Sequence, residues 1–362
     1  MIVAAHRAAL AAAYGEQAWA TIEPALRRYL AKLAATEPAA LLYLDDPAGS
    51  GLAGEAPAGA GDCEAAARLI RLQAKQQSPR PTAVLILGGD DIVPMIRVPK
   101  PPTVADDGDQ DIPTDNPFGC LTADPDRYVF PDMAVARIVA SADDGPADIA
   151  AQLDRAIRLR ETPAMRSGAM VVSNRDWVDA SQAVAMEIGS QPQIFHSAPL
   201  YRCGGDTSEF SRGIFFFNLH GVLTDSGWYG GHSGAPWRAI SPDDLADADF
   251  GGATTMACNC YGARTRGIAP PKSMALTLLR RGCAHFIGST GYAFGAIPPK
   301  TVDFSEELAR RFFVQLRSGF PAGLALHRAR REYVKARAAE GSLDNRDYKT
   351  ALQFVFFGDP LV

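Results

Sequence analysis

The chain has 362 residues, 47% of them hydrophobic and 21% charged, and carries a formal net charge of −5 at pH 7. This acidic balance leaves no basic surface for nucleic acid, and no apolar run approaches the roughly 18 residues of a membrane-spanning helix. We therefore expect neither nucleic-acid nor membrane partners, and the lack of a basic leader before an apolar core predicts a cytoplasmic protein.

The first half of the chain has the pattern of an α/β unit. Apolar residues at helical spacing predict one or two helices over 4–35, and Asp62 fits the N-cap of a helix over 63–76. The stretch 94–128 is rich in proline and acidic residues, which predicts a long loop. The other expected elements are strands over 41–44, 83–89 and 133–139 and a helix over 146–160.

The second half alternates strand and helix patterns, which favours a mainly parallel sheet flanked by helices. We place a boundary at 162–167, between an N-terminal α/β subdomain (1–165) and a second α/β subdomain (166–362). The expected strands of the second half are 169–173, 194–197, 214–219 and 283–289, its helices are 179–188, 272–281, 304–317 and 321–337, and 348–357 returns the chain to the core.

Two buried-type strands of the second half each lead to residues that can do chemistry. FFFNLHG ends in His220 and Gly221, and TTMACNCYG contains Cys258 and Cys260. Ligands of open α/β sheets bind outside the carboxyl ends of the strands, so a His and a Cys about forty positions apart can meet there. A thiol needs such a base to become a nucleophile, and Gly221 leaves room for a substrate carbonyl to approach backbone N–H groups.

These two motifs resemble the caspase-like clan of cysteine peptidases and, within it, the gingipain family. Further stretches resemble the same family: LILGGDDIVP with PTDNPFG and PDMAVARI, then AHFIGSTGYAFG, then the closing FVFFGDPLV. The resemblance covers 81–362 and implies a caspase-like α/β fold of two side-by-side subdomains, the second one catalytic. It also implies a cysteine endopeptidase that hydrolyses proteins or peptides through a thioester and needs no catalytic cofactor.

The identity of the nucleophile is open between two sulfurs. His220 would act as general base with either, since its ordinary pKa suits neutral pH. Cys260 is favoured because the clan places a Gly two or three positions after its Cys, and Gly262 follows Cys260 by two positions and Cys258 by four. In an extended strand Cys260 would also lie further toward the open edge of the sheet. The Ala-Cys-Asn context of Cys258 keeps it as the alternative.

Substrate contacts are expected from aromatic residues near these motifs. Trp228, in a Gly-rich loop, could wall a groove, and by resemblance the loop after 283–289 lines the pocket with Tyr292 and Phe294. The segment STGYAFGAIPP contains no acidic residue, so a preference for Arg or Lys is not implied. The acidic residues between 90 and 124 could bind a structural calcium ion, as gingipains do, or form a solvated loop.

Three alternatives to a peptidase remain. A caspase-like module without catalysis could bind a partner through the same groove. The LGGDD stretch could belong to a nucleotide-binding protein, but no phosphate-cradling helix start follows it. The pair Cys258 and Cys260 could bind zinc with a nearby His, but the second pair of ligands is missing, so we expect no metal there. An activating protein partner is also left open.

Overall fold

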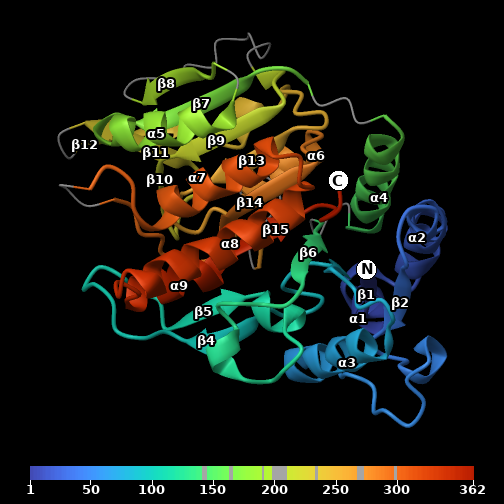
Figure 1. Cartoon of the computed structure of the whole chain (residues 1–362). Coiled ribbons are helices and arrows are strands. Elements are labelled where there is room, and N and C mark those ends of the chain that lie inside the picture. Colours follow the sequence, from blue (N-terminus) through green and yellow to red (C-terminus); the bar gives the residue numbers. More distant parts are fainter. Residues whose placement is uncertain are drawn as a thin grey trace.

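Ten strands form one sheet through both halves of the chain (Figure 1). The computed structural model describes residues 1–140, 145–162, 166–189, 191–197, 210–232, 235–266, 273–296 and 300–362. In spatial order the strands are β2 (Ala40–Tyr43), β1 (Ile2–Ala5), β3 (Ala83–Leu87), β6 (Ala134–Ile138), β15 (Phe354–Phe357), β14 (His285–Ser289), β13 (Thr254–Ala257), β9 (Ile214–Asn218), β7 (Ala169–Asn174) and β8 (Gln193–Ser197).

The sheet is mainly parallel, which confirms the predicted fold class. Neighbouring strands pair in parallel except β14 and β15, whose antiparallel ladder runs from Phe286 opposite Phe357 to Ser289 opposite Phe354. The last strand, β15, lies between β14 of the second half and β6 of the first. The sheet therefore continues across the predicted subdomain boundary, and residues 163–165 at that boundary lie outside the described part of the chain.

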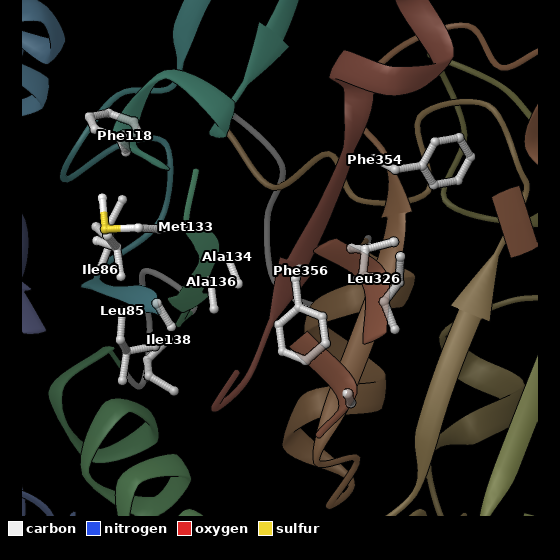
Figure 2. Packing of buried hydrophobic residues seen from close by; sticks show 14 of the residues in the cluster. Leu85, Ile86, Phe118, Met133, Ala134, Ala136, Ile138, Leu326, Phe354 and Phe356 are labelled. Carbon is white, nitrogen blue, oxygen red and sulfur yellow. The ribbon is translucent and has the colours of Figure 1, made fainter. Parts of the chain in front are cut away.

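Side chains of the central strands pack against helices on both faces of the sheet. Along β9, Phe216 belongs to a core with side chains of α7 and α8, whereas Phe215 and Phe217 belong to a core with side chains of α6. Burial on both faces explains why these strands are continuous apolar runs. Figure 2 shows Phe354 and Phe356 of β15 near Leu326 of α8.

Helices flank the sheet close to the positions that the sequence predicts. Asp62 caps α3 by accepting a hydrogen bond from the Ala65 amide, as expected. Among the described residues, no helix has the length and apolar character needed to cross a membrane. The α-helices are α1 (Arg7–Tyr14), α2 (Ala18–Ala34), α3 (Cys63–Gln76), α4 (Gly145–Glu161), α5 (Val178–Ile188), α6 (Met274–Arg280), α7 (Phe304–Arg317), α8 (Ala322–Ala339) and α9 (Asn345–Gln353).

Three local expectations are wrong. Ile2–Ala5 is a fully buried strand at a position where the Ala-rich pattern predicts helix from residue 4. The expected loop 94–128 contains a two-stranded hairpin, β4 (Ile96–Pro99) and β5 (Asp111–Thr114), and two short 3₁₀ turns. The strand that leads to His220 ends at Asn218, and His220 begins a separate strand.

Candidate active site

A cavity of about 970 Å³ opens beyond the carboxyl ends of β7, β9, β13 and β14. It brings together most of the residues predicted from the two motifs, although they come from distant parts of the chain. The lining includes His220, Gly221, Cys258, Cys260, Tyr292 and Phe294. The site is therefore assembled at the strand ends, where the topology of an α/β sheet places ligands.

His220 is held in a small sheet that folds over this cavity. It lies in β10 (His220–Gly221), which pairs with β11 (Trp228–His232), and β11 pairs in turn with β12 (Ala235–Ile240). The Trp177 ring lies 4.3 Å from the imidazole, centroid to centroid. Burial lowers the pKa of His220 below its ordinary value, and the carboxylate of Asp176 opposes this shift. The imidazole is therefore neutral at neutral pH and can accept a proton.

The amide of Asn174, at the end of β7, sets the hydrogen-bonding role of His220. Its oxygen accepts from the Gly231 amide at 3.1 Å and from the Asp176 amide at 3.2 Å. That leaves the Asn174 nitrogen facing Nε2 of His220 at 3.1 Å, as a donor. Nε2 of His220 therefore acts as the acceptor, and the neutral ring carries its proton on Nδ1.

The two cysteines follow β13 but differ in their surroundings. Cys258 is 6% exposed, and its thiol donates to the Ser305 carbonyl at 3.4 Å. Cys260 is half-buried, and its sulfur lies 3.3 Å from the Ala293 nitrogen and 3.6 Å from the Ala293 oxygen. Cys258 thus packs beneath the cavity against the start of α7, whereas Cys260 lies at the loop that lines it.

Burial raises the pKa of both thiols, but not to the same degree. For Cys258, burial is the largest cause of the shift and the nearby Glu306 carboxyl raises the pKa further, so the pKa lies well above the usual range of a thiol. For Cys260 the effect of burial is opposed by the Ala293 N–H and by the ammonium group of Lys349. The surroundings of Cys260 therefore favour a thiolate more than those of Cys258.

The turn after Cys260 differs from the expected extended strand closed by Gly262. Strand β13 already ends at Ala257, and the Gly262 amide donates back to the Asn259 carbonyl at 3.2 Å. The left-handed residue of this turn is Tyr261, with φ of +57°. The chain therefore turns directly after Cys260, but with a tyrosine in a conformation that glycine adopts more readily.

Gly221 is required for a reason that the sequence did not predict. A Cβ atom at this position would collide with the carbonyl oxygen of Cys260. The space expected for an approaching substrate is thus filled, on that side, by the backbone of Cys260. The His-Gly motif allows the His220 strand and the Cys260 turn to lie in direct contact.

Among the aromatic predictions, Tyr292 and Phe294 line the cavity but Trp228 does not. The Tyr292 and Phe294 rings lie 5.5 Å apart at the cavity wall. Trp228 is only 3% exposed and packs with Phe217 at 5.0 Å and Phe286 at 6.5 Å, centroid to centroid. Its prediction as a groove residue is therefore corrected, because β11 directs this indole into the core.

Sequence reasoning missed an acid in the cavity wall. Glu306 is 2% exposed and accepts a hydrogen bond from the Ala296 amide at 3.0 Å. Burial raises the pKa of this carboxyl to about 7. In the sequence, Asp303 and Glu306 have the spacing of a helix capping box, which predicts a purely structural role.

Four of the acidic residues considered for calcium are paired with cations of the protein itself. Asp90 pairs with Arg97 at 2.5 Å, and Asp115 pairs with Arg137 at 2.6 Å. Lys349 lies 2.7 Å from both Asp107 and Asp109. Across the described ranges, no three or more His, Cys, Asp or Glu side chains are grouped as metal ligands. These four paired carboxylates do not fit a structural calcium ion.

Comparison with known proteins points to one family. The profile described as peptidase family C25 matches residues 51–362, whereas no curated protein matches the sequence at a significant level. Gingipain R, titled an Arg specific cysteine proteinase, is 12% identical with a TM-score of 0.66, over 100% of this chain and 77% of that one. A structure titled "Structure of Protease" is 13% identical with a TM-score of 0.65, over 100% and 77%. The complex of Porphyromonas gingivalis RgpB pro- and mature domains is 11% identical with a TM-score of 0.63, over 100% and 79%. At such identities the structural likeness concerns the fold.

Proposed function

Since the chain belongs to peptidase family C25 and is thus a cysteine-type peptidase, we propose that it is an endopeptidase with Cys260 as nucleophile and His220 as general base. One observation carries the proposal. His220 and Cys260, forty positions apart in the sequence, line the same cavity at the carboxyl ends of neighbouring strands. The backbone of Cys260 also lies against Gly221, directly beside His220.

The resting pair is a neutral thiol and a neutral imidazole. The pKa of His220 is lowered by burial and that of Cys260 is raised by burial, so an ion pair is not favoured before substrate binds. The proton therefore moves during attack. Nε2 of His220, the ring nitrogen without a proton, gives up its hydrogen bond from Asn174 and takes the thiol proton. At the same time the sulfur bonds to the scissile carbonyl carbon, and the carbonyl electrons move to oxygen.

The tetrahedral species then collapses, the C–N bond breaks, and the leaving amine takes the proton from His220. This yields a thioester between Cys260 and the acyl half of the substrate. Water attacks the thioester with His220 again as base, which releases a carboxylic acid and restores the thiol. Backbone N–H groups beside Cys260 and Gly221 are the proposed donors to the oxyanion.

Cys258 is the second candidate nucleophile, but its surroundings favour a packing role. Its sulfur is directed to the Ser305 carbonyl, and its pKa is raised further than burial alone would raise it, by the neighbouring acid. A sulfur that must lose its proton beside a carboxyl group is a poor nucleophile. We therefore assign Cys258 to the floor of the cavity.

Proteins or peptides are the proposed substrates, and a regulatory protein partner is a further proposal. The pro- and mature domains of RgpB form a complex. Profiling with a peptide library tests the proposed function. Cleavage of internal peptide bonds that is lost on treatment with a thiol reagent is expected. A folded protein that binds peptides and cleaves none of them would instead favour the non-catalytic module.

A further inference from the structure

We propose that Asp109, which comes from the hairpin segment of the first half, is a positioning residue for the nucleophile. This inference rests on the proposed function of Cys260. One oxygen of the Asp109 carboxylate accepts from the Tyr261 hydroxyl at 3.0 Å, and the other accepts from the Tyr292 amide at 2.7 Å. The carboxylate thus joins two segments that both contact Cys260.

The first of these segments is the turn that directly follows the nucleophile. Tyr261 is the next residue after Cys260 and has φ of +57°, a conformation that is unfavourable for non-glycine residues unless other contacts hold it. Two long-range contacts hold it here. Its amide donates to the Gly291 carbonyl at 2.9 Å, and its hydroxyl donates to Asp109. The phenol contact therefore helps to fix the backbone that carries Cys260.

The second segment is the loop that contacts the sulfur itself. Tyr292 precedes Ala293, whose N–H lies 3.3 Å from the Cys260 sulfur. A Cβ atom on Gly291 would collide with the Asp109 carboxylate, so this loop packs closely on that group. Asp109 therefore fixes Cys260 from two sides, through the turn after it and through the loop that donates to its sulfur.

A buried lysine pairs with the Asp109 carboxylate. Lys349, on α9, is fully buried and lies 2.7 Å from Asp109 and 2.7 and 2.8 Å from the two oxygens of Asp107. Burial would raise the pKa of Asp107, but hydrogen bonds from Lys349 and Thr103 outweigh it and lower the pKa. The cluster therefore joins the first half, α9 and the nucleophile turn through charge-assisted hydrogen bonds.

A role in stability alone would have a different signature. Tyr333 offers a matched comparison, because its hydroxyl donates to Asp347 in another buried tyrosine–aspartate pair, between α8 and α9. Tyr333 does not line the cavity. Loss of either hydroxyl leaves a carboxylate oxygen short of one donor, so both variants should be destabilised to a similar extent. Only the Tyr261 hydroxyl is linked to the nucleophile.

The test compares Tyr261→Phe with Tyr333→Phe in the full chain, by steady-state kinetics on a peptide substrate and by the rate at which iodoacetamide alkylates Cys260. We expect Tyr261→Phe to lower kcat by about 10- to 100-fold with little change in KM, because the sulfur is misplaced. We also expect slower alkylation of Cys260, because the Ala293 N–H is no longer aligned with the sulfur. Tyr333→Phe should keep the wild-type kcat and alkylation rate and lower only the unfolding temperature.

A Tyr261→Phe protein with wild-type kcat and alkylation rate would overturn the inference. If the wild-type protein itself cleaves no peptide, the proposed function fails, and the alkylation rates still decide whether Asp109 positions the thiol. Asp109→Asn is a second variant, which keeps one oxygen acceptor and removes the charge next to Lys349. It should lower kcat at least as far as Tyr261→Phe does, and the phenylalanine variant alone decides the question if Asp109→Asn does not fold.

Discussion

Arg137 on β6 is buried whereas His220 on β10 is exposed, although both are polar side chains near strand ends. Arg137 is fully buried and donates to Asp115 and to the carbonyls of Gly88, Gly89 and Val93. His220 is neutral and faces a cavity, with the Asn174 amide and the Trp177 ring as its close neighbours. A buried charge whose donors are all bound stabilises the fold. A neutral base whose acceptor nitrogen faces an amide donor at the edge of a cavity can take part in catalysis.

The variant His220→Ala should distinguish most clearly between the surroundings of His220 and those of Arg137. Removing the base should lower kcat/KM by about 10²- to 10⁴-fold, the usual contribution of a positioned general base. Little stability should be lost, because the imidazole borders a cavity and leaves no buried charge behind. Peptide cleavage and thermal unfolding measured on the same sample check both halves of this prediction. Undiminished turnover in the variant would remove the proposed dyad.

Arg137→Met should show the opposite pattern. It leaves the Asp115 carboxylate buried without its cation, which typically destabilises a protein by about 3–5 kcal/mol. Denaturant unfolding measures the change, and any protein that remains folded should keep the wild-type kcat. The control is the double variant Arg137→Met with Asp115→Leu, in which no charge is left unpaired and much of the stability should return. A single variant as stable as the wild type would show that this pair is not structural.

Glu306 is an acid in the cavity wall, and its variant tests whether this group behaves like His220, which faces the cavity, or like Arg137, which stabilises the fold. Its pKa is raised from 4.5 to about 7 in the fold, so the protonated form is favoured. The stability from the neutral carboxyl is therefore complete below pH 4.5 and is lost as pH rises through about 7. Above that pH, Glu306→Gln should be more stable than the wild type by on the order of 3 kcal/mol.

The comparison of Glu306→Gln with the wild type needs unfolding free energies at several pH values. The difference between the two proteins should be smallest near pH 4.5 and grow toward pH 8. A difference that does not depend on pH would mean that the Glu306 carboxyl has an ordinary pKa in the folded protein.

The smallest expected effect is on the pH dependence of catalysis. Because burial lowers the pKa of His220 and raises that of Cys260, kcat/KM should stay high from below pH 6.5 to above pH 9.0. Asp176→Asn removes the charge that partly offsets the lowering of the His220 pKa. The acid limb of the pH profile of kcat/KM should therefore move to still lower pH. A shift of that limb to higher pH would contradict the electrostatic account of His220.

Much of the architecture follows from local patterns in the sequence. Strands buried on both faces, such as β3 and β9, are continuous apolar runs, and the cap at Asp62 has its own signature. Strand β1 was missed because its four apolar residues are separated from an Ala-rich helix by His6 alone. The hairpin of β4 and β5 was missed because its prolines resemble those of a loop.

The candidate site was predictable where it depends on motifs and not where it depends on distant contacts. His220 and Cys260 were found from strand ends followed by glycines. Lys349 could not be found, because its carboxylate partners lie about 240 positions away and a lysine in a polar helix normally faces solvent. Trp228 was misplaced because a Gly-rich segment suggests a loop, whereas strand pairing turns the indole inward.

The identity of the attacking sulfur is the central claim, and covalent mapping tests it most directly. The folded protein is treated with a peptide-derived thiol-reactive probe, the modified residue is identified by mass spectrometry, and turnover is measured for Cys260→Ala and Cys258→Ala. We predict labelling of Cys260, complete loss of turnover in Cys260→Ala, and retained turnover in Cys258→Ala. Labelling of Cys258, together with turnover that survives Cys260→Ala and is abolished by Cys258→Ala, would contradict this account.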